Sequence, residues 1–167
     1  MLVVLSDTHG TESPRLTPHL EETLAEADLL VHAGDFTTER VLDAFESRVD
    51  RLVAVAGNSD STAVRKRLPE TTTVEWDGLR LVLTHGHRHD ETALSLLARQ
   101  ETADVAVVGH THSPGSRSVG DLTILNPGSH ADPRGSRSAY LAIERAVNAP
   151  RGEFRTVKGR VFQTVEL

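Results

Sequence analysis

The feature that most constrains the fold of this chain is a regular alternation of short apolar runs with amphipathic segments. The apolar runs LVVLS, DLLVHA and RLVAVA are separated by RLTPHLEETLAEA and TERVLDAFES. In the first amphipathic segment Leu20, Leu24 and Ala27 recur at helical spacing, so a helix is expected to begin near Pro18. Alternation of this kind predicts β-α-β units and a largely parallel sheet.

The pattern changes after Arg67. The stretch TTTVEWDGLRLVLTHG holds two strand-like runs joined by Asp77-Gly78, a dipeptide that strongly predicts a hairpin. A second sheet is therefore expected to begin here, and a further helix is expected over residues 91–100. The length of 167 residues suits one α/β domain spanning 1–167.

The end of the chain is again strand-like. Runs at 138–144, 154–157 and 161–165 predict strands, the last two joined by a hairpin at Lys158-Gly159. The intervening Pro/Gly/Ser-rich stretch 126–138 is expected to be a functional loop within the domain.

Acidic, amide and imidazole side chains follow the apolar runs directly. The carboxyl ends of parallel strands meet at one edge of a sheet, where ligands bind, so these side chains are expected to converge. Residues at i and i+2 of an extended chain point to one face, as in GHTH. The residues expected to converge are Asp7, His9, His32, Asp35, Asn58, Asp60, His85, His87, His89, His110 and His112.

The chemistry of this set suits a metal site without sulfur. The chain has no cysteine, so any metal must be held by nitrogen and oxygen ligands. Carboxylate, neutral imidazole and an amide oxygen suit Mn²⁺, Fe, Zn²⁺, Ni²⁺ or Co²⁺, and a carboxylate with two oxygens can bridge two ions. Two ions held in this way form the clamp found in phosphatases and nucleases.

Several of these segments occur in a known order. The segments SDTHG, HAGDF, VAGNSD, LTHGH, VGHTH and LNPGS follow one another as in the calcineurin-like metallophosphoesterases, and the chain resembles the minimal archaeal and bacterial phosphodiesterases of that superfamily from Leu2 to about Arg134. The resemblance implies a two-sheet α/β sandwich with helices packed on the outer faces.

The resemblance also implies a ligand set and a reaction. One ion would be held by Asp7, His9, Asp35 and His112, and the other by Asp35, Asn58, His85 and His110. Asp35 would bridge the two ions. The implied reaction is hydrolysis of phosphate esters, foremost phosphodiesters, by a metal-bridging hydroxide, with Asp35, Asn58, His85 and His110 as catalytic residues. Two divalent ions are expected as cofactors, with Mn²⁺ first and Ni²⁺, Co²⁺, Zn²⁺ or Fe as alternatives.

One position departs from the larger members of the superfamily. They carry a histidine after the asparagine, where this chain has Ser59. A serine hydroxyl is a poor proton donor near pH 7, so acidic leaving groups, or protonation by water, Asp60 or His87, are expected.

Other polar residues have competing interpretations. We expect Asn58, His87 and Arg134 to contact substrate, although His87 could serve only to support a ligand and Arg134 could simply pack. His19, His32 and His130 are expected to lie at the surface, pack, or support the site. Trp76 is expected to pack in the core or at its rim.

Charge and composition limit the partners. A net charge of −6 argues against general nucleic-acid binding. No run is long enough for a membrane span, and the N-terminus lacks a basic leader, so a cytoplasmic location is expected. The expected ligand is a small phosphate ester, and a homodimer would be a common outcome for a domain of this size.

Two alternatives stay open at this stage. Within the enzymes, a phosphomonoesterase or protein phosphatase would use the same chemistry. Outside them, a eukaryotic retromer scaffold resembles this minimal fold, has an altered site and docks partners, so a non-catalytic protein-binding scaffold is the rival function.

Overall fold

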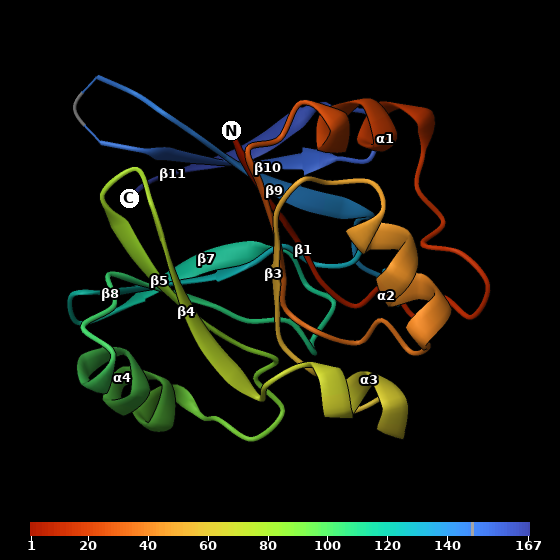
Figure 1. Cartoon of the computed structure of the whole chain (residues 1–167). Coiled ribbons are helices and arrows are strands. Elements are labelled where there is room, and N and C mark those ends of the chain that lie inside the picture. Colours follow the sequence, from red (N-terminus) through yellow and green to blue (C-terminus); the bar gives the residue numbers. More distant parts are fainter. Residues whose placement is uncertain (148) are drawn as a thin grey trace.

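The structure is a computed structural model that describes residues 1–147 and 149–167. The described residues form two β-sheets that pack face to face (Figure 1). The first sheet has the order β11-β10-β9-β1-β2-β3, in which β1, β2 and β3 are parallel and the other neighbours are antiparallel. Its strands are β1 (Leu2–Leu5), β2 (Leu29–His32), β3 (Leu52–Ala54), β9 (Ala139–Glu144), β10 (Arg151–Thr156) and β11 (Val161–Glu166).

The second sheet has the order β4-β5-β6-β8-β7. Its inner strands β5, β6 and β8 run parallel, and an antiparallel strand closes each edge. Its strands are β4 (Thr71–Trp76), β5 (Leu79–Thr84), β6 (Val105–Val107), β7 (Gly115–Val119) and β8 (Leu122–Asn126). The predicted hairpin at Asp77-Gly78 joins β4 to β5, and both residues have positive φ, as such a turn requires.

Four helices are present in the described residues, and each begins at a capping side chain. They are α1 (Pro18–Ala25), α2 (Glu39–Glu46), α3 (Thr62–Arg67) and α4 (Glu91–Gln100), and their caps are Thr17, Thr38, Ser61 and Asp90. Each capping oxygen accepts a backbone N–H of the first turn, which satisfies a donor that the helix itself cannot. The predicted starts near Pro18 and at Glu91 are confirmed.

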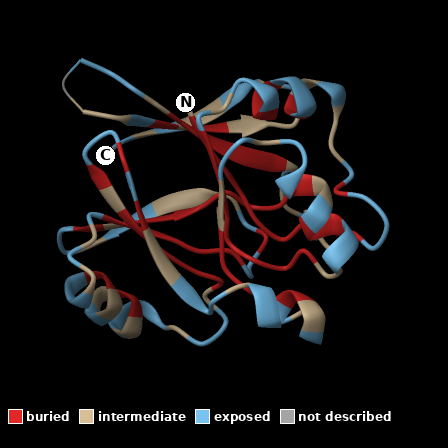
Figure 2. Cartoon of the chain, viewed as in Figure 1, coloured by how far each residue is buried: buried red, intermediate tan, exposed pale blue. Residues whose placement is uncertain are grey.

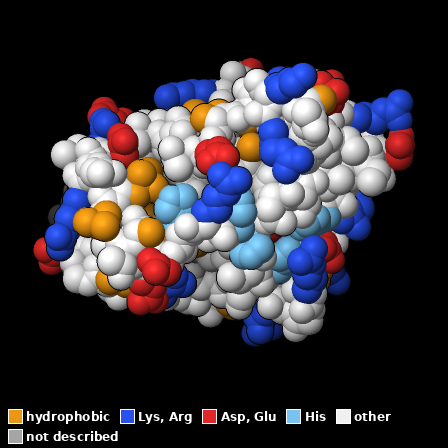
Figure 3. Space-filling model, turned by 90° about the horizontal axis from the view of Figure 1, so that it is seen from below, with side chains coloured by type: hydrophobic (Ala, Val, Ile, Leu, Met, Phe, Trp, Pro, Cys, Tyr) orange, Lys and Arg blue, Asp and Glu red, His pale blue; other side chains and the backbone are white. Residues whose placement is uncertain are grey.

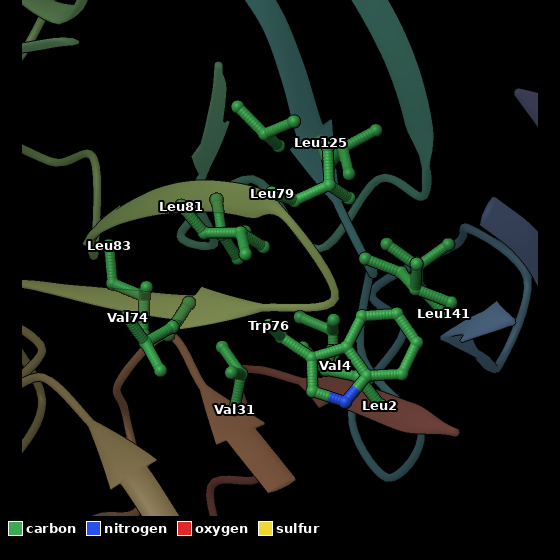
Figure 4. Close-up of a cluster of buried hydrophobic side chains, with 14 of the residues drawn as sticks. Leu2, Val4, Val31, Val74, Trp76, Leu79, Leu81, Leu83, Leu125 and Leu141 are labelled. Atoms are coloured by element: carbon green, nitrogen blue, oxygen red, sulfur yellow. The ribbon is translucent and has the colours of Figure 1, made fainter. Parts of the chain in front are cut away.

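The main core lies between the two sheets. Alternate residues of β1, Leu2 and Val4, face inward, as do Leu81 and Leu83 of β5. Trp76 at the end of β4 is 5% exposed and packs in this layer, as the close-up in Figure 4 shows. The prediction of a packing role for Trp76 is therefore confirmed.

The outer faces of both sheets are covered by helices. Val3 and Leu5 of β1 pack against side chains of α1, α2 and α3, while Val82 of β5 packs against α4. The central strands β1, β2 and β6 are consequently buried along their whole length and coloured red in Figure 2, while the edge strands and the helices are only partly buried. The expected two-sheet α/β sandwich with outer helices is confirmed.

The structure also contains elements that the sequence patterns did not predict. The β7–β8 hairpin lies in a stretch with few apolar residues in its first strand, GSRSV, and α3 has only six residues. Strand β10 begins at Arg151, three residues before the predicted start. That residues 1–167 form a single domain stays a prediction. Within the described residues, no helix is long and apolar enough to cross a membrane.

Candidate metal centre

Five loops bring the predicted ligands together. Asp7 and His9 follow β1, Asp35 follows β2 and Asn58 follows β3, all in the first sheet. The second sheet contributes the remaining residues, which follow β5 and β6 and are His85, His110 and His112. The site therefore lies where the carboxyl ends of parallel strands from both sheets meet.

The backbone at the site adopts a conformation that side chains ordinarily avoid. The residues Asp7, His9, Asp35, His110 and His112 all have φ between +46° and +66°. Left-handed conformations of non-glycine residues cost free energy and cluster at functional sites. The strained backbone at these positions is therefore consistent with a functional site.

Two glycines allow the loops to approach one another. A Cβ on Gly109 would lie 1.9 Å from Ser6 Oγ, and one on Gly57 would lie 2.1 Å from Asp35 Oδ1. Both distances are far too short for atoms that are not bonded to each other. Glycine is thus required immediately before His110 and Asn58 by the close packing of the loops.

A first group of ligand atoms joins Asp7, His9 and His112. His112 Nε2 lies 3.3 Å from Asp7 Oδ1 and 3.2 Å from His9 Nε2. The carboxylate of Asp7 is fully buried, and its oxygens accept the backbone N–H of His110 at 3.0 and 3.2 Å.

A second group joins Asp7, Asp35 and His85. His85 Nε2 lies 3.3 Å from Asp35 Oδ2 and 3.1 Å from Asn58 Oδ1. The same Asp35 Oδ2 also lies 3.3 Å from His9 Nε2 in the first group. Asp35 Oδ2 therefore lies close to a histidine of each group, and Asp7 belongs to both groups.

Backbone carbonyls orient two of the imidazoles. His85 Nδ1 bonds to the carbonyl of Ala33 at 2.7 Å, and His112 Nδ1 bonds to the carbonyl of Asp132. A carbonyl only accepts, so the proton must be on Nδ1 in both rings. In the neutral rings Nε2 is left as a lone pair that points into the cluster, which is the arrangement of a metal-binding histidine.

Asp60 connects the loops after β2 and β3. Its carboxylate accepts the N–H groups of Gly57 and Thr37 at 2.7 Å and that of Asp35 at 3.2 Å. Asp35 Oδ1 in turn accepts the N–H of Ser59 at 2.7 Å. These bonds hold Asp35 in place from both sides.

Burial and neighbouring charge act against each other at these groups. Burial raises the pKa of Asp35, but hydrogen bonding and attraction from His85, together with the Ser59 N–H, bring it well below its ordinary value. Burial lowers the pKa of His85, but the Asp35 carboxylate outweighs this and raises it overall. For Asp7 burial prevails and raises the pKa. Carboxylate oxygens and imidazole nitrogens are thus crowded into a buried space. A divalent cation bound between them would offset their mutual repulsion.

The remaining predicted residues surround the cluster. His110 and His87 are exposed, and the ring centre of each lies 5.4 Å from that of His85. Their own ring centres are 6.1 Å apart. Arg134 Nη2 lies 3.4 Å from His9 Nε2, while its Nε pairs with Asp132 at 3.1 Å. In Figure 3 histidine side chains gather on one face of the molecule, with arginines beside them.

Two contributions were not predicted from the sequence, and the supporting role of His32 was one of several that the sequence left open. The carbonyls of Ala33 and Asp132 carry no sequence signal, because any residue supplies a carbonyl. His32 lies fully buried beneath the site and bonds to Thr8 Oγ1 at 2.9 Å and to the N–H of Gly34 at 3.2 Å. Sequence position left its role open between packing and support.

Known proteins place this site in a family. The calcineurin-like phosphoesterase superfamily domain matches residues 1–147. The chain belongs to this superfamily. It is 32% identical to a probable metallophosphoesterase of Methanocaldococcus jannaschii over 139 residues, which is 80% of this chain and 70% of that protein. It is 31% identical to the phosphodiesterase YfcE of Escherichia coli over 162 residues, with 85% of both chains covered.

Solved structures agree with the fold. The structure of YfcE, a phosphoesterase from E. coli, superposes with a TM-score of 0.74 at 26% identity and covers 99% of this chain and 98% of that one. Vacuolar protein sorting 29 from Cryptosporidium parvum superposes with a TM-score of 0.83 at 17% identity, covering 99% and 97%. The second likeness concerns the fold alone.

Family membership and the clustered ligands lead to the same general chemistry. A metallophosphoesterase domain uses divalent metal ions to hydrolyse phosphate esters, and this chain carries the clustered carboxylates and imidazoles to bind them. Metal-dependent phosphoester hydrolysis is therefore the general activity that the family and the site support.

Proposed function

We propose that the protein hydrolyses phosphodiesters with two divalent metal ions held in one centre. The observation that supports two ions is the position of Asp35 Oδ2, which lies 3.3 Å from both His9 Nε2 and His85 Nε2. A carboxylate between two groups of ligands is the arrangement that bridging requires.

Each ion would have its own set of ligands. Asp7, His9, Asp35 and His112 would hold one, and Asp35, Asn58, His85 and His110 would hold the other. Mn²⁺ is the first expectation for both. When bound, the pair would supply a nucleophile near neutral pH and neutralise charge on the phosphoryl oxygens.

The residues at the rim would position the substrate. Arg134 is 56% exposed in its side chain and can turn its guanidinium toward a phosphoryl oxygen. His87 lines a pocket together with Asn58, Arg65 and Arg88, so it can donate a hydrogen bond to an ester bound there. The Asp60 carboxylate already accepts hydrogen bonds from the backbone N–H groups of three other residues. Water or His87 is therefore favoured as the proton donor to the leaving group.

The preference for diesters has two supports. Relatives from E. coli and M. jannaschii are named phosphodiesterases. The described residues place no additional domain over the site, so a phosphorus atom with two organic groups can reach it. A cytoplasmic location and a homodimeric state stay predictions.

Hydrolysis of bis(4-nitrophenyl) phosphate and of 4-nitrophenyl phosphate tests the proposal. Protein from which a chelator has removed the metal should be inactive. Addition of Mn²⁺, Ni²⁺, Co²⁺ or Zn²⁺ should restore activity, and the diester should be cleaved in preference to the monoester. Asp35→Asn should abolish it, because an amide cannot bridge two cations. Asp121→Asn, at a surface turn distant from the centre, is the matched control.

Two other results would redirect the assignment. Preferential cleavage of the monoester would make the protein a phosphomonoesterase. Folded protein that binds metal but cleaves neither ester with any ion would favour the non-catalytic scaffold.

A further inference from the structure

A pocket with an apolar floor and a polar rim opens directly beside the candidate metal centre. It has a volume of about 290 Å³ and lies on the outer face of the second sheet, between the start of α4 and the loop that carries His110. Its apolar wall is formed by Leu94 of α4, Val108 after β6, and Ile124 of β8. The pocket is thus built from three separate elements of the fold.

The walls of the pocket are already held in place. Leu94, Val108 and Ile124 belong to one packed cluster and are at most 5% exposed, so the pocket does not depend on mobile side chains. An ion pair between Arg117 of β7 and Glu91 of α4, at 3.1 Å, connects the two elements near the pocket. Polar residues of the rim, among them His89, Ser113, Ser116 and Arg117, surround this apolar floor. A preformed hollow that combines apolar surface with polar groups is typical of a ligand site.

The pocket and the metal centre share a wall. Gly109, His110 and Thr111 line the pocket, and the N–H of His110 donates to the Asp7 carboxylate in the centre. A second pocket beside the centre is lined by Asn58, His87 and Arg65, and by Arg88, which pairs with Glu70 at 2.8 Å. In Figure 3 hydrophobic side chains lie to the left of the histidines, and Lys or Arg side chains lie among the histidines and to their right. The first pocket therefore adjoins the metal centre directly.

We propose that this pocket binds an apolar, ring-sized organic group of the ester while its phosphoryl group lies at the metal centre. The inference rests on the proposed function and adds a substrate class, esters with an aryl group. A cavity of about 150 Å³ is enough for benzene, so the pocket holds one substituted ring. The shared wall at His110 gives the ring and the phosphoryl group adjacent places.

Binding of inert analogues tests the pocket without catalysis. Diphenylphosphinate and dimethylphosphinate carry the same anionic group on P–C bonds that are not hydrolysed, and they differ only in their organic groups. In Zn²⁺-loaded protein with labelled methyl groups, diphenylphosphinate should shift the NMR signals of Leu94, Val108 and Ile124 in a saturable way. Dimethylphosphinate should leave them in place. Leu20 of α1 and Leu42 of α2, which pack against the first sheet, should not respond to either compound. Equal shifts with both compounds, or none with the diphenyl compound, would overturn the proposal.

Kinetics provide an independent measurement. Phenyl 4-nitrophenyl phosphate and methyl 4-nitrophenyl phosphate share a leaving group, so the ratio of their kcat/KM values reports the retained group alone. The ratio should be about ten or more, given the apolar area that a ring buries. Val108→Phe, which fills the pocket, should bring the ratio close to one, and the exposed Ser118→Phe on β7 should preserve it.

The two measurements separate the two proposals. If neither ester is cleaved, the proposed function fails, and the methyl signals of the unaltered protein still decide whether the pocket takes a ring. If both esters are cleaved at equal rates, the function stands and the pocket proposal is wrong.

Discussion

At the scale of single residues, Ser59 bears most directly on substrate range. Its N–H donates to Asp35, and its hydroxyl accepts from Asn58 Nδ2 at 3.2 Å, so it lies beside the expected ligands. Ser59→His is expected to raise kcat on diesters with alkyl leaving groups by about ten-fold or more, because imidazole is a competent proton donor near pH 7. A 4-nitrophenyl ester should barely respond, since that leaving group departs without a proton. Steady-state kinetics on both esters measure the difference, and the same change in both would contradict the argument.

At the scale of elements, His32 at the end of β2 connects two ligand-bearing loops. Thr8, one of its hydrogen-bond partners, lies between Asp7 and His9, and Gly34, the other, precedes Asp35. His32→Ala is expected to weaken metal binding by about 10–100-fold, as loss of such supporting bonds commonly does. Competition with a chromophoric chelator measures the affinity.

Two controls accompany this prediction. His19→Ala removes a partly exposed histidine on α1 and should leave metal affinity unchanged. Circular dichroism shows whether the His32 variant is folded. An unaltered affinity in folded protein would mean that His32 only packs, against Phe36 at 3.8 Å between ring centres.

At the scale of the whole molecule, buried neutral histidines couple stability to pH. His130 Nε2 donates to the carbonyl of Pro14 at 2.8 Å, and Nδ1 has no hydrogen-bond partner among the described residues. Burial lowers the pKa of His130 to about 4 from 6.5. Below pH 6.5 the imidazole of His130 becomes protonated in the unfolded chain, whereas in the native state it stays neutral until about pH 4. The free energy of unfolding therefore decreases as the pH falls through that interval.

The size of this effect is measurable. His130 contributes at most about 1.4 kcal/mol per pH unit to the slope of the free energy of unfolding against pH. Its contribution to the loss of stability levels off below about pH 4. Urea unfolding between pH 7 and 4 should show a shallower loss of stability in His130→Gln than in the unaltered protein. His19→Gln is the matched comparison. If the free energy of unfolding varied equally with pH in His130→Gln and in the unaltered protein, the pH dependence could not be assigned to His130.

Prediction from sequence succeeded where a local pattern decides the structure. Asp77-Gly78 specifies its own turn, and the polar residues that cap helices define where α1 and α4 begin. It failed for β7, because an edge strand with Ser116, Arg117 and Ser118 has no apolar alternation to recognise. It failed for α3 because six residues give no helical period.

The candidate site divides in the same way. Donor types are local: Asp, His and Asn directly after apolar runs already imply a metal site of nitrogen and oxygen, and the absence of cysteine excludes thiolate ligands. By itself the sequence thus determined the alternating β-α-β order of the first elements, the kinds of ligand and the edge at which they gather. The tertiary structure alone decided the rest: Asp35 between two groups of ligands, carbonyls of Ala33 and Asp132 that orient the imidazoles, and an apolar pocket against His110. The reason is physical, since these features arise from contacts between residues far apart in the chain, which no local pattern encodes.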